Sequence, residues 1–429
     1  MNDLATNDAA GLILARLQTL YPQLIDLSLG RVQRLLADAG HPEQRLPPVI
    51  HVAGTNGKGS TCAFLRAIGE AAGWPVHVTT SPHLVRLNER FRVAGHLVDD
   101  ATLTATLAEL EQINAGAPIT LFEVLAAAGY LLFARAPASL CVIEVGLGGR
   151  YDATNVIDAP ACAVITSISL DHQDFLGDSV ARLAWEKAGI MKPGRPVVTG
   201  AQKPAVLDVL RGSAEETGAR LLLRGQHWEI TGTGAGLRYQ DEAGLLLLPQ
   251  PSLPGAHQVE NAGLAVAALR ASGLALPNEA YAGIAQAEWP GRLQHLHGRL
   301  ARLLPPDFEL WLDGGHNPGA GEVLAVQLAT WADRPAYLVV GMKQSKDVSG
   351  FLAPLLPLSA GAWAVAEKNQ HLALPVEAVI AASGGVAHLG PDLAGAFAQI
   401  AKLPPGRVLI CGSLYLAGEA LRMDGAPPN

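Results

Sequence analysis

Residues 51–61 read His51-Val52-Ala53-Gly54-Thr55-Asn56-Gly57-Lys58-Gly59-Ser60-Thr61, and this stretch decides the fold expected for the chain. The segment before it, 48–53, is apolar and partly β-branched, which is typical of a short buried strand. The segment after it, 62–72, has apolar residues at helical spacing and ends at Gly73. In a strand–turn–helix unit, glycines let backbone N–H groups turn toward an anion, and the helix N-terminus adds partial positive charge. The stretch therefore predicts a phosphate-binding loop.

The match to the general phosphate-loop pattern, G-x-x-x-x-G-K-[ST], is incomplete. Gly59 rather than a hydroxyl residue follows Lys58, and Val52 stands at the upstream glycine position. In a phosphate loop, Lys58 would reach the β- and γ-phosphates and the hydroxyl of Ser60 would face Mg²⁺. The alternative is a tight strand-to-helix turn with a solvated lysine. The flanking strand and helix favour the phosphate loop.

Length and composition set the frame for this loop. A chain of 429 residues is long for one domain, so two domains are expected. With 31 basic against 39 acidic residues the net charge is −8, which argues against a protein whose main ligand is nucleic acid. The four cysteines are scattered without metal-ligand spacing, and neither a signal peptide nor a membrane span is expected. These features predict a cytoplasmic protein.

Functional residue types recur where predicted strands end. Gly54, Ser81, Glu144 and His172 each fall at the carboxyl end of a different apolar run. Continuous apolar runs predict a parallel sheet covered on both faces, and in such a sheet the carboxyl ends share one edge, where ligands bind. A phosphate loop, a serine, a glutamate and a histidine on one edge could hold a nucleotide with Mg²⁺. For Glu144, the alternative is a structural salt bridge to a helix lysine or arginine.

The predicted fold class is α/β. Residues 1–293 are expected to form an ATPase domain with a parallel sheet and a small β-rich insertion at about 221–250. Residues 298–429 restart the α/β alternation as a smaller Rossmann-like domain, with strands at 309–313, 337–341 and 407–411. The segment at 289–292 is the expected connection between the domains.

Eight motifs in order along the chain resemble the dihydrofolate synthase/folylpolyglutamate synthase family, within the wider Mur-ligase group. The extra Gly59 resembles this family's own version of the phosphate loop. Gly315 is a small departure, because alanine is expected in Asp-Gly-Ala-His-Asn-Pro. The motifs are Gly54–Ser60, Ser81–Leu84, Glu144–Asn155, Asp171-His172, Glu186–Ile190, Trp289–Arg292, Asp313–Pro318 and Gly412–Leu416.

The resemblance implies an ATP-dependent amide ligase. A pterin-bearing carboxylate takes the γ-phosphate to become an acyl phosphate, and the amine of L-glutamate then displaces phosphate. Phosphorylation supplies the leaving group that a carboxylate lacks, and Mg²⁺, Lys58 and an arginine would stabilise the charge that develops. The expected cofactors are ATP and Mg²⁺ at two sites. The expected partners are dihydropteroate, folates and L-glutamate, bound by a monomer.

The same likeness assigns metal and catalytic residues. Lys187 resembles a family lysine that is carbamylated, which turns an ammonium into an acidic oxygen ligand. On residue pattern alone, a surface lysine beside Glu186 would be the better interpretation. The implied metal ligands are Ser60, Ser81, Glu144, His172 and Lys187, and the implied catalytic residues are Lys58, Lys187, His172, Arg292 and His316.

Nucleotide contacts are implied in both halves of the chain. Arg292 could meet the γ-phosphate when the domains close. His316 could orient phosphate or glutamate, or merely cap the helix that follows Pro318. The implied ATP contacts are Thr55, Asn56, Gly57, Lys58, Gly59, Ser60, Asn261, Arg292 and Asp313.

Three segments resemble those that hold dihydropteroate in bifunctional bacterial members. On sequence alone, Arg31 is better interpreted as an ordinary surface residue. Ser413 is the residue implied for the glutamate site. The implied pterin contacts are Ser28, Leu29, Gly30 and Arg31, then Leu121, Phe122, Glu123 and Val124, then Tyr151, Asp152 and Ala153.

Three alternatives remain beside the bifunctional enzyme that residues 120–123 favour. The first is a folylpolyglutamate synthase without dihydrofolate synthase activity. The second is a cell-wall Mur ligase, which the short segment before the phosphate loop disfavours. The third is a switch or binding module that uses ATP without ligating anything.

Overall fold

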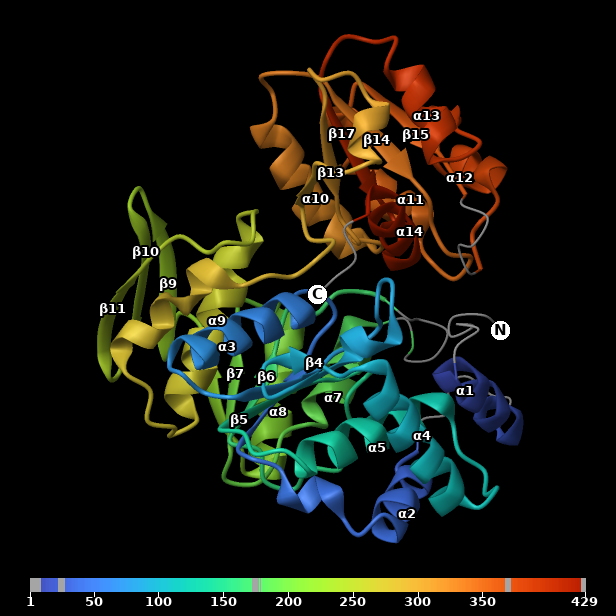
Figure 1. Ribbon diagram of the computed structural model, residues 1–429. Helices are drawn as coiled ribbons and strands as arrows, with labels where there is room; N and C mark the ends of the chain where they lie inside the picture. The colour runs from blue at the N-terminus through green and yellow to red at the C-terminus, as the bar shows by residue number, and fades with distance from the viewer. Residues whose placement is uncertain (1–8, 22–27, 172–176, 178, 367–371, 426–429) are drawn as a thin grey trace. The chain divides into compact units, whose positions relative to one another are not determined.

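The computed structural model describes residues 9–21, 28–171, 177, 179–366 and 372–425, and they divide into two compact units. Unit 1 comprises Met1–Ile168, Ser179–Ser252 and Val259–Ala287. Unit 2 comprises Ser169–Asp178, Leu253–Gln258 and Glu288–Asn429. Each unit has its own sheet, labelled in Figure 1.

Unit 1 is built on an eight-stranded sheet whose central strands run parallel, as predicted. The antiparallel pairs are those made by β3 (Phe91–Val93) and β4 (His96–Leu97), at one end of the sheet, which the sequence did not predict. In spatial order the strands are β4 (His96–Leu97), β3 (Phe91–Val93), β2 (Val76–Thr79), β5 (Leu140–Glu144), β1 (Val49–Ala53), β6 (Cys162–Ile165), β7 (Pro196–Thr199) and β8 (Arg220–Leu223).

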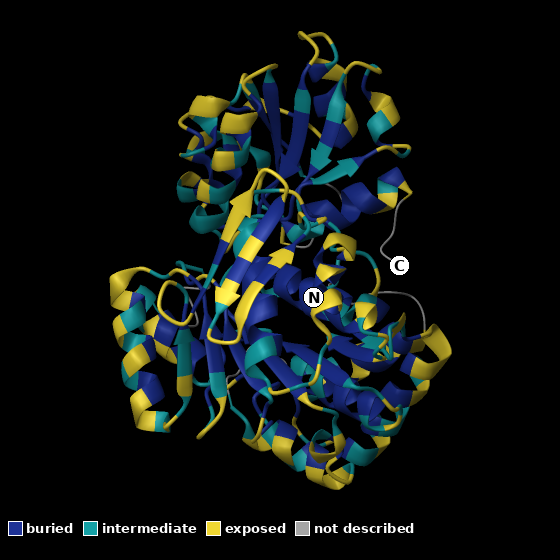
Figure 2. Cartoon of the chain, turned by 90° about the vertical axis from the view of Figure 1, so that its left-hand side faces the viewer, coloured by how far each residue is buried: buried dark blue, intermediate teal, exposed yellow. Residues whose placement is uncertain are grey.

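Helices cover both faces of this sheet, because its central strands are apolar on both sides. On one face, Cys141 and Ile143 of β5 pack into a core with helices α1, α2, α4 and α5. On the other, Gly69 of α3 lies against Leu140. Figure 2 shows these strands buried and the outer helix faces exposed. The helices are α1 (Ala9–Leu20), α2 (Gly30–Asp38), α3 (Lys58–Ala71), α4 (Asp100–Asn114), α5 (Leu121–Ala134), α7 (Val180–Ala188), α8 (Pro204–Thr217) and α9 (His257–Ala271), with 3₁₀ turns at Pro42–Arg45, Leu87–Arg90 and Asn278–Gln286.

The β-rich insertion is smaller than predicted. Residues 221–223 were assigned to it, but they belong to β8, which pairs with β7 in the main sheet. The insertion itself is a three-stranded antiparallel sheet of β9 (Trp228–Thr233), β10 (Gly236–Asp241) and β11 (Gly244–Leu248). Its residues alternate in burial: Leu237 and Tyr239 of β10 are buried, and Arg238 is exposed. This is the pattern of a sheet with one covered face.

Unit 2 has a six-stranded sheet, parallel apart from β12. The predicted strands at 309–313, 337–341 and 407–411 are confirmed to within one residue. The strands, in spatial order, are β12 (Gln294–Leu296), β13 (Glu309–Leu312), β17 (Arg407–Cys411), β14 (Ala336–Val340), β15 (Gly361–Ala364) and β16 (His388–Leu389). The helices are α10 (Pro318–Thr330), α11 (Val348–Leu352), α12 (Val376–Ala382), α13 (Leu393–Ile400) and α14 (Leu414–Asp424), with 3₁₀ turns at Ala301–Leu303 and Leu356–Leu358.

β12 begins at Gln294, directly after the expected end of the first domain. The limits 1–293 and 298–429 remain a proposal. Within the described residues, no helix combines the length and apolar character that crossing a membrane requires.

Candidate functional site

The predicted phosphate loop, residues 54–60, has glycines at two positions whose backbone conformation other residues rarely adopt. Gly54 has a φ of +149° and Gly57 a φ of +90°. A Cβ at Gly54 would lie 1.7 Å from Thr166 Oγ1, and one at Gly57 would lie 2.4 Å from Asn261 Oδ1. Lys58 begins α3 and donates to the carbonyls of Gly54 (3.2 Å) and Thr55 (3.3 Å). The lysine thus folds over its own loop, with the N-terminus of a 14-residue helix beneath it.

Neighbouring strands hold the loop in place. The N–H groups of Thr55 and Asn56 donate to the carbonyl of Ser167, at 2.8 and 3.4 Å. Ser167 Oγ donates back to the carbonyl of Asn56 at 3.2 Å. Ser167 was missed by sequence reasoning, although it lies two residues after the end of β6, where the strand-end pattern could have identified it. The structure brings Asn261 of α9, a predicted ATP contact, directly against Gly57.

Glu144 and Ser81 meet at the carboxyl edge of the sheet. Glu144 ends β5, opposite Val52 of β1, and its side chain is 6% exposed. The backbone N–H of Ser81 donates to Glu144 Oε2 at 3.1 Å. The pKa of the Cys62 thiol in α3 is raised by burial and by the charge of Glu144, and is lowered by the charge of Lys58. Both charged groups therefore act on the first turns of α3, which also hold buried Ser60.

The predicted metal ligands are only partly covered by the structure. His172 lies outside the described residues. In the part of the chain that is described, no three His, Cys, Asp or Glu side chains cluster in a way that would hold a metal. Of the predicted ligands described, only Glu144 is of those types, since the others are Ser60, Ser81 and Lys187.

Lys187 is not the surface lysine that its residue pattern alone predicts. It lies in the last turn of α7 and is only 5% exposed. The loop after β5 packs closely on this turn, because a Cβ at Gly149 would lie 2.7 Å from the carbonyl oxygen of Glu186. Arg150 N–H donates to the same carbonyl at 2.8 Å. Burial raises the pKa of the Glu186 carboxyl. The positive charges of Arg150 and Arg182 act to lower it, but the pKa remains above its ordinary value.

The third predicted pterin segment is folded around Asp152. Its carboxylate accepts the N–H of Leu147 (2.7 Å) and both the N–H (3.0 Å) and the hydroxyl (2.5 Å) of Thr154. Burial raises the pKa of Asp152, and these hydrogen bonds oppose that shift. Neighbouring Ala153 is buried, whereas Tyr151 is 43% exposed. Tyr151 is thus the side chain of this segment most open to a ligand.

Two other predicted pterin segments are joined by an ion pair. Arg31 Nη2 lies 2.9 Å from Glu123 Oε1, and Arg31 Nε donates to Glu123 Oε2 at 3.0 Å. Arg31 is 19% exposed at the side chain, so the prediction of an ordinary surface arginine was wrong. Glu123 also accepts the N–H of Thr120 at 2.7 Å, which completes the capping box that Thr120 forms at the start of α5.

The remaining residues of these segments lie around that pair. Phe122 packs on the loop after β5, since a Cβ at Gly146 would lie 2.2 Å from its ring. Val124 is buried in the core, whereas Gly30 is exposed. Partly buried are Ser28, Leu29 and Leu121.

In unit 2, Asp313 organises the turn after β13. Its Oδ1 accepts the N–H of Gly315 at 2.7 Å and its Oδ2 accepts that of Leu293 at 2.9 Å. Arg292 lies beside this turn, because a Cβ at Gly314 would lie 2.8 Å from Arg292 Nη1. The structure thus brings Arg292 and Asp313, both predicted ATP contacts, together.

His257 is a neighbour of this pair that sequence reasoning missed. Burial lowers its pKa, the charge of Asp313 opposes that shift, and the charge of Arg292 adds to it. Its position at the start of α9, four residues before Asn261, was the available signal.

His316 and Ser413 lie at helix starts in unit 2. His316 Nδ1 donates to the carbonyl of Gly314 at 2.8 Å, and its Nε2 lies 3.6 Å from Asp171 Oδ2. Asn317, not His316, caps α10 by accepting the N–H of Ala320. Ser413 is buried and caps α14.

Asp171 gathers several donors in unit 2. It accepts hydrogen bonds from Lys346 Nζ at 2.5 Å and Asn317 Nδ2 at 3.0 Å. Sequence reasoning did not identify Lys346 as a site residue. Its pairing with a residue 175 positions earlier carries no sequence signal.

Two family models and several curated relatives match this chain. The family model described as Mur ligase middle domain matches residues 52–269, and the one described as dihydrofolate synthetase, C-terminal domain, matches residues 299–423. The dihydrofolate synthase/folylpolyglutamate synthase of Escherichia coli is 36% identical over 425 residues, covering 96% of this chain and 95% of the relative. The folylpolyglutamate synthase of Lacticaseibacillus casei is 31% identical over 405 residues, covering 90% and 92%.

Solved structures extend the similarity to the fold. The Escherichia coli FolC structure in complex with DHPP and ADP gives a TM-score of 0.88 at 34% identity, over 98% of this chain and 99% of that one. A bifunctional folylpolyglutamate synthase/dihydrofolate synthase with Mn, AMPPNP and L-glutamate bound gives 0.83 at 33% identity, over 95% and 97%. Together with the phosphate loop and the ordered motifs, these matches show that the chain belongs to the dihydrofolate synthase/folylpolyglutamate synthase family of ATP-dependent ligases, within the Mur ligase group.

Proposed function

We propose that this protein adds L-glutamate both to dihydropteroate and to folates, with ATP as the source of energy. The observation that carries the proposal is the sheet edge of unit 1, where a glycine-constrained phosphate loop, buried Ser60 and the buried carboxylate of Glu144 occur together. A buried carboxylate is costly unless a cation or hydrogen bonds compensate it. A nucleotide with its divalent cation would use each of these groups.

The nucleotide contacts of unit 1 follow from the loop. The N–H groups at the start of α3 and the ammonium of Lys58 would bind phosphate oxygens. Asn261, already against Gly57, would border the nucleotide. The backbone fits such a ligand, because neither Gly54 nor Gly57 leaves room for a side chain on the loop.

We assign ATP contacts in unit 2 to Arg292 and Asp313. The arginine would stabilise the negative charge that develops during phosphoryl transfer. Asp313 would hold the turn in which the arginine lies, through its bond to Leu293 N–H.

Metal binding is proposed at two sites. Ser60 and Glu144 supply the hard oxygen donors that Mg²⁺ prefers, and Ser81, His172 and Lys187 would complete the sites. Bound Mg²⁺ would neutralise phosphate charge. Because Lys187 is buried, we propose that it is carbamylated: CO₂ joins Nζ with loss of a proton, leaving an anionic oxygen ligand.

The reaction proceeds in two balanced steps. The carboxylate of the pterin substrate attacks the γ-phosphorus of ATP, which forms an acyl phosphate and releases ADP. The amine of glutamate attacks the acyl carbon, the C–O bond to phosphate breaks, and the amine loses a proton to give the amide. Arg31, Glu123 and the segment 151–153 are assigned to the pterin, and His316 and Ser413 to glutamate or phosphate.

Residues 1–293 and 298–429 are proposed as the two functional domains, acting as a monomer. All four cysteines are buried free thiols, which fits the reducing conditions of the cytoplasm, the proposed location. The net charge of −8 supports a small-molecule substrate rather than nucleic acid.

The deciding experiment measures glutamate-dependent ADP formation with 7,8-dihydropteroate and, separately, with tetrahydrofolate. Activity with both substrates is expected. Activity with tetrahydrofolate alone would make the protein a folylpolyglutamate synthase only. ATP hydrolysis that neither substrate stimulates would instead favour the ATP-dependent switch.

A further inference from the structure

His51 is a polar residue where the fold favours an apolar one. It lies in the middle of β1, is 0% exposed, and has apolar neighbours Ile50 and Val52 in a strand buried throughout. Its Nδ1 has no hydrogen-bond partner among the described residues. Burying an unsatisfied polar atom is unfavourable, and a valine or leucine would avoid that cost. The histidine at this position is therefore best explained by an interaction of its other ring nitrogen, Nε2.

Nε2 lies 3.0 Å from Thr154 Oγ1. Complete burial lowers the pKa of His51 to about 3, so the ring is neutral at pH 7 and carries one N–H. The hydroxyl proton of Thr154 is already donated to Asp152 Oδ1 at 2.5 Å. The network consequently assigns the ring proton to Nε2, which donates to the threonine oxygen.

Thr154 is the link between β1 and the loop of residues 146–155. His51 holds its hydroxyl, and the hydroxyl of Tyr130 on α5 donates to its carbonyl at 2.8 Å. Thr154 in turn supplies two donors to Asp152, and Leu147 N–H supplies another. One carboxylate thereby joins the two ends of the loop.

We propose that His51 is a positioning residue for substrate binding: through Thr154 it orients Asp152 and sets the shape of the 146–155 loop that receives the pterin substrate. This inference rests on the proposed function, which places the substrate at residues 151–153. Without the Nε2 donor, the Thr154 hydroxyl can rotate away from Asp152. The carboxylate then loses a buried hydrogen bond, and the backbone from Leu147 to Thr154 loses its fixed path.

The test compares two substitutions at His51 with a matched control. His51→Leu removes the donor at similar volume, whereas His51→Gln can place an amide N–H near the position of Nε2. His77→Leu is the control, because His77 is also 0% exposed and lies on β2 of the same sheet. Its partners are the carbonyl of Ala136 and the N–H of Ala94, both outside the loop.

The expected result is a selective defect. His51→Leu should raise KM for the pteroate or folate substrate about tenfold, the size of one lost buried hydrogen bond, and leave KM for ATP within about twofold. His51→Gln should restore most of this loss. His77→Leu should lower Tm comparably without a selective rise in the pterin KM. Equal rises in both KM values, or the same pattern in His77→Leu, would overturn the proposal.

A second readout does not depend on catalysis. Hydrogen–deuterium exchange of the peptide spanning 146–155 should be about tenfold faster in His51→Leu than in wild type or His77→Leu. Unchanged exchange would refute the positioning role. If the wild-type protein proved unable to use pteroates or folates, this exchange experiment would still decide whether His51 orders the loop. The failure of the proposed function and that of this inference are thus separable.

Discussion

At the scale of single residues, the candidate nucleotide site is distinguished by how closely other atoms approach its glycines, and not only by the presence of glycine. Gly57 combines a positive φ with a neighbour, Asn261 Oδ1, only 2.4 Å from where a Cβ would lie. Gly73, at the other end of α3, has a φ of +75° but nothing within 4 Å. A side chain at Gly57 would therefore add both backbone strain and crowding, whereas one at Gly73 would add backbone strain alone.

The first prediction uses that pair. Gly57→Ala should raise KM for ATP at least about tenfold, because the methyl group displaces Asn261 and deforms the loop; backbone strain alone costs about 1 kcal/mol. Gly73→Ala should lower stability by a similar amount and leave KM for ATP unchanged. Steady-state kinetics and thermal unfolding measure both effects. A normal KM in Gly57→Ala would show that the loop does not bind ATP.

The second prediction concerns the buried lysine of α7. Lys187→Ala should reduce kcat at least about a hundredfold, since a proposed metal ligand is lost. Acetate or another short carboxylic acid should restore part of the activity by supplying the missing anionic oxygen. Lys192→Ala, a nearby partly buried lysine, should show no such rescue. Full activity of Lys187→Ala would contradict the carbamate.

At the scale of elements, strand interiors were predictable and strand edges were not. Continuous apolar runs located β1, β2, β5 and β6, because burial on both faces leaves a clear pattern. The strands β3, β4, β12 and β16 span only two or three residues each, which is too short for such a pattern to be recognised. β8 was found as a strand but placed in the wrong sheet, since hydrophobic pattern does not encode a strand's partner.

The candidate site followed the same rule. Strand-end residues such as Gly54, Ser81 and Glu144 were found because parallel strands place their carboxyl ends on one edge. The Arg31–Glu123 ion pair joins residues 92 positions apart, and nothing local in the sequence reports it. The His51–Thr154 contact, 103 positions apart, was missed for the same reason.

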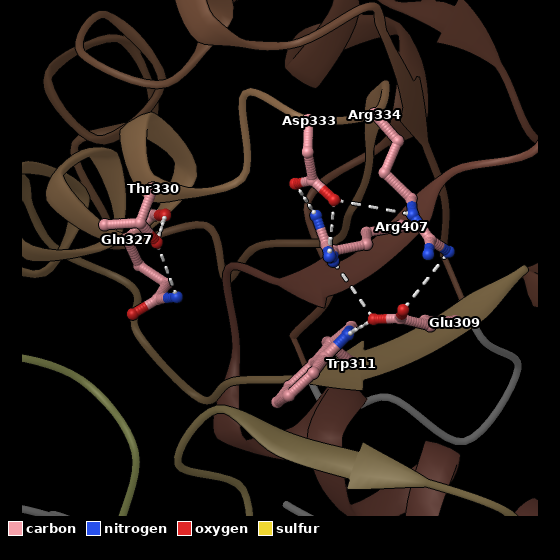
Figure 3. Close-up of polar contacts among 7 residues, drawn as sticks. All are labelled: Glu309, Trp311, Gln327, Thr330, Asp333, Arg334 and Arg407. Carbon is pink, nitrogen blue, oxygen red and sulfur yellow. Dashed lines mark hydrogen bonds and ion pairs between the residues drawn. The ribbon is translucent and has the colours of Figure 1, made fainter.

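The third prediction tests an ionic network at the start of β13 and β17 (Figure 3). Arg407 bonds Asp333 at 2.6 Å and Glu309 at 3.0 Å, and Trp311 Nε1 also donates to Glu309. The hydrogen bond from Arg407 lowers the pKa of Asp333. For Glu309, burial acts to raise the pKa, but the bonds from Trp311 and Arg407 and the charges of Arg407 and Arg334 together lower it.

Depressed carboxyl pKa values add stability that is present above the unfolded values, 3.8 for Asp333 and 4.5 for Glu309, and is lost as the pH falls through the lower folded values. Arg407→Met should therefore lower Tm by roughly 2–4 °C at pH 7 and by less at pH 3. Arg302→Met, at an exposed arginine of the same unit, should have little effect at either pH. An equal deficit at both pH values would mean that lost packing, not charge, is responsible.

At the scale of the whole molecule, the residues proposed to contact ATP are divided between the two units. Unit 1 supplies the phosphate loop and the buried carboxylate, and unit 2 supplies Arg292 and Asp313 in one turn. The family similarity extends over both units, since the two matching family models together span 52–269 and 299–423.

The fourth prediction belongs to this scale. Arg292→Ala should lower kcat by about a hundredfold or more with only a small change in KM for ATP, because the arginine is assigned to charge that develops in the transition state. Arg302→Ala, in the same unit, should leave both parameters unchanged. A raised KM with normal kcat would place Arg292 in ground-state binding instead.

The most direct test of the central claim follows the oxygen atoms of the acceptor carboxylate. Dihydropteroate labelled with ¹⁸O at both carboxylate oxygens is incubated with ATP, glutamate and the enzyme. The ¹⁸O content of the inorganic phosphate and of the amide product is then measured by mass spectrometry. An acyl phosphate predicts one ¹⁸O transferred to inorganic phosphate for each amide formed, with the other retained in the amide. Amide formation with no ¹⁸O in phosphate would contradict the mechanism, and phosphate release without amide would contradict the ligase itself.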